Sequence, residues 1–164
     1  MPPPKDADVM LEARHVTAML LPGGAGLPPV PVIVLELEDG REFTLYNVPY
    51  DIVRAVNRLQ SKESYGFGDR ESVFEIVVDM RDSIAGLGRL LEYVVIDEMD
   101  YTTSLYTAKA RFNLGGIYMT RRMIPSHAVF LALLFSKPIY VSKRLVDQQE
   151  AFSRQQYEEE VEEE

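Results

Sequence analysis

The residues best suited to acid–base chemistry stand at the start of an expected helix. Pro125 suits the first helical position, where its missing N–H has no role, and Ser126 and His127 follow it. The free N–H groups at a helix N-terminus attract anions such as phosphate, and imidazole is the commonest general acid–base group. We therefore predict Ser126 and His127 as catalytic residues of a reaction at a phosphate. The alternative interpretation is that both are ordinary residues of a first helical turn.

Basic side chains flank this helix on both sides. Arg121 and Arg122 end the strand expected before it, and Lys137 follows it. A phosphate held at the start of the helix needs cations nearby, so these three residues are predicted to bind phosphate. The alternative is a solvated basic rim.

A second group of candidate residues is acidic. Asp97, Glu98 and Asp100 are expected where a strand runs into a turn. Closely spaced carboxylates can hold a divalent metal such as Mg²⁺ or Mn²⁺, which would assist phosphodiester hydrolysis, so the three are predicted metal ligands and the metal a predicted cofactor. The alternative is a solvated turn. The chain has no cysteine and two histidines, which excludes a thiolate nucleophile and a histidine-rich zinc site.

Composition indicates the class of protein that must position these residues. A chain of 164 residues with 46% hydrophobic and 26% charged residues is typical of one globular domain. The formal charge is −9, and subtracting the six glutamates of residues 158–164 leaves −3, which is unlike a basic nucleic-acid binder. The acidic tail is expected to be a solubility appendage, or else a nucleic-acid mimic. No apolar run approaches the roughly 20 residues of a membrane helix, and no signal sequence is visible, so we expect no membrane partner and a cytoplasmic location.

The periodicity of the apolar residues predicts an α+β fold. Runs with a period of two residues, typical of strands, alternate with runs spaced by three and four, typical of helices. Strands are expected over 9–21, 30–38, 41–47, 90–96, 105–114, 117–123 and 138–141. Helices are expected over 49–59, 71–84 and 125–135, with a last helix that Ser142 caps and that reaches Gln156 before fraying into the glutamates.

Two segments of the chain resemble each other. Residues 48–56 align with residues 124–132, and each segment has a β-branched residue, a proline and then a helix, after an expected hairpin. This predicts an internal duplication of a strand-hairpin-helix unit within one domain, built on a mixed and largely antiparallel sheet. The expected organisation is a disordered lead-in over 1–7, a domain over 8–147, and a C-terminal helix with an acidic tail over 148–164.

The second of these helices is apolar on every side. Residues 128–135 read Ala-Val-Phe-Leu-Ala-Leu-Leu-Phe, and a helix of this kind must be covered all round. We expect a second copy of the chain to cover part of it, which predicts a homo-oligomer, with a dimer as the first choice. The alternative is that the last helix of the same chain covers it.

The stretch from Met123 to Val141 resembles the hallmark of the bifunctional nuclease (BFN) family. Members carry Arg-Pro-Ser-Asp-Ala, an apolar helix and then Pro-Ile-Tyr-Val. The matching residues are Pro125, Ser126, Ala128, Pro138, Ile139, Tyr140 and Val141. The resemblance implies a single α+β domain with a duplicated unit, self-association and nuclease activity on DNA and RNA, which makes nucleic acid an expected partner.

The chain departs from the family pattern at two positions. Ile124 stands where the family has arginine, and His127 stands where it has aspartate. Two hypotheses therefore remain open: a nuclease that cleaves DNA or RNA phosphodiester bonds, and a non-catalytic, self-associating interaction or regulatory module that retains the BFN fold.

Overall fold

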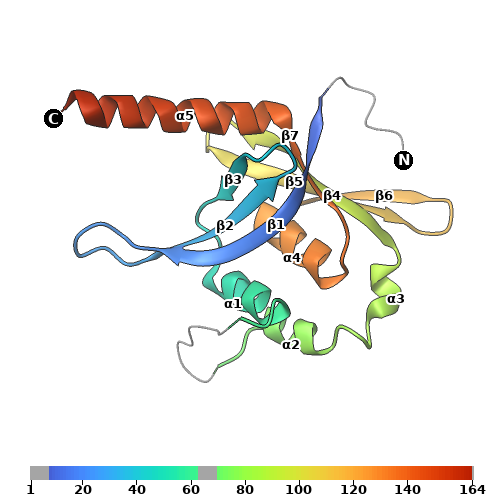
Figure 1. Ribbon diagram of the computed structural model, residues 1–164. Coiled ribbons are helices and arrows are strands. Elements are labelled where there is room, and N and C mark those ends of the chain that lie inside the picture. Colours follow the sequence, from blue (N-terminus) through green and yellow to red (C-terminus); the bar gives the residue numbers. More distant parts are fainter. Residues whose placement is uncertain (1–7, 63–69, 164) are drawn as a thin grey trace.

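Residues 8–62 and 70–163, which the computed structural model describes, form one seven-stranded sheet and five helices (Figure 1). The strands are β1 (Met10–Leu21), β2 (Val30–Leu37), β3 (Glu42–Leu45), β4 (Leu91–Asp100), β5 (Leu105–Asn113), β6 (Tyr118–Met123) and β7 (Ile139–Ser142). The helices are α1 (Tyr50–Leu59), α2 (Val73–Asp79), α3 (Ala85–Gly88), α4 (Pro125–Leu134) and α5 (Lys143–Glu162). The expected lead-in, residues 1–7, lies outside the described residues.

The order of strands in the sheet is β3-β2-β1-β7-β4-β5-β6. β7 pairs with β4 in parallel, and every other pairing of the described strands is antiparallel. The predicted α+β class with a mixed, largely antiparallel sheet is therefore confirmed. The order is also symmetric about β7: β1-β2-β3-α1 and β4-β5-β6-α4 are both three-stranded meanders that end in a helix. The two segments aligned in the sequence begin these two helices.

The sheet curls around α1 and α4, which pack against each other and against its inner face (Figure 1). Phe43 of β3 and Tyr106 of β5 show this curvature. Their ring centroids lie 5.0 Å apart, although β2, β1, β7 and β4 lie between these two strands in the sheet. Fully buried aliphatic side chains of β2, β4 and β5 line this inner face, with Leu35, Ile96 and Ala108 at its centre. The core is therefore a wrapped sheet filled by two helices.

The expectation that a second subunit covers α4 finds no support in its burial. Ala128, Val129 and Ala132 are fully buried within the chain itself, and Phe130 is 5% exposed. Neighbouring α1, the strands β4 and β5, and Phe74 of α2 supply the cover; the Phe74 and Phe130 rings meet edge-on at 5.5 Å. The cover comes from these elements and not from the last helix, so the alternative prediction is wrong. Leu131, Leu133 and Phe135 stay partly exposed, and the homo-oligomer stays a prediction.

The helix expected over 71–84 is shorter than predicted. α2 ends at Asp79, and a turn follows it before the short α3. Of the apolar residues at helical spacing in this segment, Val73, Met80 and Leu87 are 64%, 49% and 53% exposed, whereas Val77 and Ile84 pack on the core together with Phe74 and Val78.

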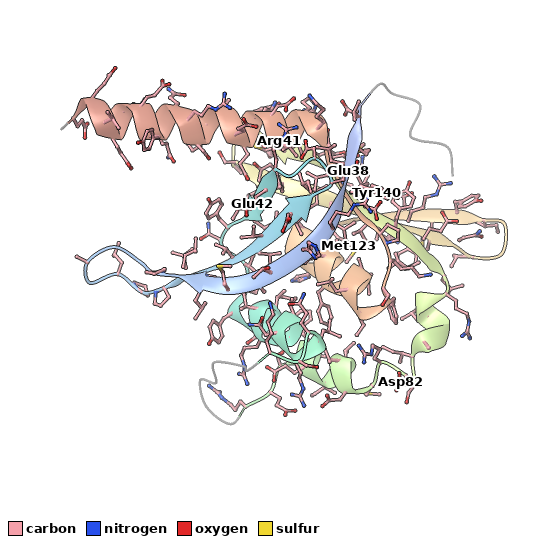
Figure 2. All side chains as sticks on the ribbon, in the orientation of Figure 1. Glu38, Arg41, Glu42, Asp82, Met123 and Tyr140 are labelled. Atoms are coloured by element: carbon pink, nitrogen blue, oxygen red, sulfur yellow. The ribbon has the colours of Figure 1, made fainter. Side chains whose placement is uncertain are left out.

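α5 is the longest helix and is attached to the body only by its first part. Leu145 and Val146 are buried, and Arg41 of the β2–β3 turn donates hydrogen bonds to Asp147 and Glu150 (Figure 2). From residue 151 onward every described residue is exposed, yet the helix continues to Glu162. It therefore extends further than the predicted end at residue 156, and the predicted boundary at 148 falls inside it.

Ser142 occupies the cap position of α5, but its side chain makes no capping hydrogen bond. No described helix is both long and apolar enough to span a bilayer.

One side chain of α5 satisfies the free edge of β3. The Gln149 amide accepts a hydrogen bond from the Thr44 N–H at 2.8 Å and donates one to the Thr44 carbonyl at 2.9 Å. It thus pairs with the edge strand as another strand would, which closes that edge to other chains.

We expect Gln149→Ala to lower the free energy of unfolding by about 1–2 kcal/mol, because two hydrogen bonds to the backbone are lost. Urea unfolding followed by circular dichroism would measure this. Gln155→Ala is the matched control, since Gln155 is exposed and bonds only along its own helix, to Glu159. Equal effects of the two substitutions would contradict the role of Gln149.

Candidate functional site

The predicted catalytic residues lie at the start of α4, in contact with α2. Ser126 is 3% exposed and its hydroxyl has no hydrogen-bond partner among the described residues. The His127 ring packs against the Phe74 ring, with centroids 5.3 Å apart and the planes inclined at 57°. His127 is half-buried, so its imidazole is reachable from solvent but contributes to the packing between the two helices.

The backbone at this helix start already uses part of its hydrogen-bonding capacity. Pro125 has no N–H, and the N–H groups of His127 and Ala128 both donate to the Ile124 carbonyl, at 3.0 and 3.1 Å. These two N–H groups point into the helix and are not available to bind a phosphate. The anion site predicted at Ser126 and His127 is therefore weaker than the sequence suggested.

The predicted metal ligands lie within β4 and not in the turn after it, because β4 extends to Asp100. The Lys109 amine donates to Asp97 at 3.0 Å and lies 3.0 Å from Glu98, which also pairs with Arg122 at 2.8 Å. The hydrogen bond from Lys109 is the main cause of a lowered pKa at Glu98. These carboxylates are thus neutralised by cations of the neighbouring strands.

Asp100 has a different role. It accepts a hydrogen bond from the Thr102 N–H at 2.8 Å, which lowers the pKa of its carboxyl and fixes the turn into β5. Within residues 8–62 and 70–163, no three His, Cys, Asp or Glu side chains gather closely enough to hold a metal ion. Metal binding by Asp97, Glu98 and Asp100 stays a prediction without geometric support.

The alternation of side chains along β5 and β6 separates the predicted phosphate ligands. Ala108 and Ala110 are fully buried on the inner face, so Lys109 between them points to the outer face. Arg122 pairs with Lys109 and shares that outer face, whereas Arg121 pairs with Ala110 and lies on the side of the helices. The two arginines therefore cannot contact one phosphate together.

Lys137 is remote from both arginines. It follows the C-terminal end of α4, whose ten residues span about 15 Å, whereas Ser126 and His127 stand at the other end. The predicted site residues thus occupy three places: the outer face of the sheet with the turn after β4, the helix side of β6 with the start of α4, and the end of α4.

The comparison of the two halves missed a second repeated motif. Leu59-Gln60-Ser61-Lys62 ends α1, and Leu134-Phe135-Ser136-Lys137 ends α4. Each serine has a positive φ, 56° and 55°, and each lysine N–H donates 2.8 Å to a carbonyl five residues earlier. This is the Schellman geometry of helix ends. The two Leu-x-Ser-Lys motifs are 75 residues apart and the aligned helix starts are 76 residues apart, so the shared pattern appears in the alignment only when a one-residue gap is allowed.

Both lysines of this repeated motif line one cleft of about 780 Å³. It opens where β1 separates from β7: their pairing ends at Glu12, β1 has a bulge at Arg14, and Pro138 offers no N–H for a further bond. The polar lining residues are Glu12, Arg14, His15, Thr17, Glu36, Gln60, Lys62, Ser136 and Lys137, and the apolar ones are Ala13, Val16, Leu133, Pro138 and Ile139. His15 lies on the exposed rim of this cleft.

No protein-family model matches this chain, and a search of the curated proteins finds no match. The resemblance to the bifunctional nuclease family, and the nuclease function that it implies, therefore stay predictions that rest on residues 123–141.

Proposed function

We propose that this protein is a non-catalytic regulatory module with a BFN-like fold, which acts by binding and not by hydrolysis. The observation that supports this proposal is the dispersal of the predicted catalytic groups over three places in the fold. Phosphodiester hydrolysis needs an anion site and a proton-transfer group within hydrogen-bond reach of one phosphate. The outer-face carboxylates pair with Lys109 and Arg122, and the whole sheet separates them from His127.

The nuclease hypothesis is the second candidate, and one feature favours it. The His127 imidazole has no hydrogen-bond partner in the described part of the chain, and the adjacent Ser126 hydroxyl has none either. An imidazole reachable from solvent, beside an unpaired hydroxyl at the start of a helix, has the chemistry of a proton-transfer site.

Digestion of labelled single- and double-stranded DNA and RNA, with Mg²⁺, with Mn²⁺ and with a chelator, would separate the two candidates. We expect the same trace of cleavage, or none, for the wild type and for His127→Ala. His15→Ala is the matched control, because His15 is the other histidine and lies on the cleft rim. A turnover that falls about 10²–10⁴-fold in His127→Ala alone, the usual contribution of a general acid–base group, would overturn the non-catalytic proposal and establish the nuclease.

A further inference from the structure

The cleft between β1 and the ends of α1 and α4 has the features of a ligand site. Its volume of about 780 Å³ lies within the range of about 300–1,000 Å³ typical of small-molecule sites. We propose that it binds a phosphorylated sugar, either free or as part of a nucleotide, with Lys62 and Lys137 on the phosphate. The proposal does not depend on whether the chain cleaves nucleic acid.

Lys62 and Lys137 supply the charge that attracts a phosphate. Neither amine has an ion-pair or hydrogen-bond partner among the described residues, although the chain is acidic overall. The C-terminal ends of α1 and α4 bring about half a negative charge each, and two full positive charges exceed this. The last carbonyls are also partly satisfied by the Schellman hydrogen bonds of the lysines.

The remaining charges of the cleft nearly cancel. Arg14 lies 3.5 Å from Glu12 and 3.5 Å from Glu38, so its charge is balanced within β1 and β2. His15 stands opposite Glu36 in the backbone register of β1 and β2. With histidine counted as neutral, the cations Arg14, Lys62 and Lys137 are matched by the carboxylates Glu12, Glu36 and Glu38, so this region is neutral on a protein whose formal charge is −9, and the two lysines are the cations in it that have no ion pair among the described residues.

The uncharged part of the lining favours a sugar over a bare phosphate. Gln60 donates its amide N–H to the Val16 carbonyl at 2.8 Å, which leaves its Oε1 buried and without a partner. This oxygen is closed to solvent, so the groups of the lining that can hydrogen-bond to the hydroxyls of a sugar are the Thr17 and Ser136 hydroxyls. Leu133, Pro138 and Ile139 offer apolar surface for the carbon skeleton.

Isothermal titration calorimetry of the full chain with ribose 5-phosphate, AMP, ribose and inorganic phosphate would test the proposal. We expect ribose 5-phosphate to bind more tightly than ribose or inorganic phosphate, and the result with AMP to show whether a base adds affinity. Lys62→Met and Lys137→Met keep the unbranched stem and remove the charge. Each should weaken binding of ribose 5-phosphate about tenfold or more, because a hydrogen bond to a charged group is lost.

Arg81→Met is the matched control, since Arg81 is an exposed cation in the turn after α2 and does not line the cleft. It should leave the affinity unchanged, and thermal melting would verify that the lysine variants are folded. Three outcomes would overturn the proposal: no binding of ribose 5-phosphate or AMP to the wild type at 10 mM or so, equal affinity in the folded lysine variants, or inorganic phosphate binding as tightly as ribose 5-phosphate.

Discussion

Replacing Phe130 by alanine is expected to lower the free energy of unfolding by about 3–5 kcal/mol, the usual cost of removing a buried phenyl ring. Phe130 is 5% exposed, and its ring meets the Phe74 ring edge-on at 5.5 Å. The substitution removes the contact between α4 and α2 and leaves a cavity that the packed helices cannot close. Urea unfolding of the two proteins under identical conditions would measure the difference.

Phe152→Ala is the matched control for Phe130→Ala, because Phe152 is 60% exposed on the free part of α5 and should change stability by less than about 0.5 kcal/mol. Light scattering on the same samples addresses the oligomer predicted from the sequence. If Phe130→Ala lowered the molecular mass without destabilising the fold, α4 would face a second subunit and the burial described above would be insufficient to explain it.

Replacing Glu75 by alanine is expected to cost about 3–5 kcal/mol, for a different physical reason. Its carboxylate is 4% exposed and lies 3.2 Å from the Arg54 Nε and 3.3 Å from an Arg58 nitrogen. Arg54 is itself only 12% exposed, so removal of Glu75 leaves a buried positive charge without compensation. Denaturant unfolding would report the loss, and α2 should be the element that detaches from α1.

Two variants sharpen this test. Glu71→Ala removes a carboxylate that is 49% exposed and pairs with Arg58 at 3.4 Å, so its cost should stay below about 1 kcal/mol. The double substitution Glu75→Leu with Arg54→Leu removes both buried charges, and most of the stability should return. A double variant as unstable as Glu75→Ala would show that packing, and not the unpaired charge, causes the loss.

The sequence predicted the strands and α1 well, because their apolar residues repeat with the period of the element, and it predicted α4 from Pro125 and the apolar run that follows it. It failed at α2, where Val73 and Met80 have helical spacing but face solvent. Apolar residues stand on two sides of this helix, Val73 and Met80 on one and Phe74 and Val78 on the other, so periodicity alone does not select the buried side. Contacts with residues distant in the chain decide that Phe74 faces the core.

Some positions in the candidate site follow from a single strand or helix, and others depend on how distant strands pair. The opposite directions of Arg121 and Arg122 follow from strand alternation, and the distance of Lys137 from His127 follows from helix length, so both could have been predicted. The cleft could not, because it depends on the bulge at Arg14 and on the end of the β1–β7 pairing. The bulge lies in the pairing of β1 with β2, and the β1–β7 pairing joins residues more than 100 positions apart in the chain.

The exposed part of α5 holds the glutamates of its far end at a distance from the charged residues of the body. Its twelve residues from Ala151 to Glu162 extend about 18 Å from the body, whereas the Debye length at physiological salt is about 8 Å. The glutamates at its far end are therefore largely screened from the carboxylates of the sheet. The chain can thus carry a strongly negative end without repulsion that would loosen the core, and the resulting dipole moment would orient the molecule so that a basic surface meets this helix first.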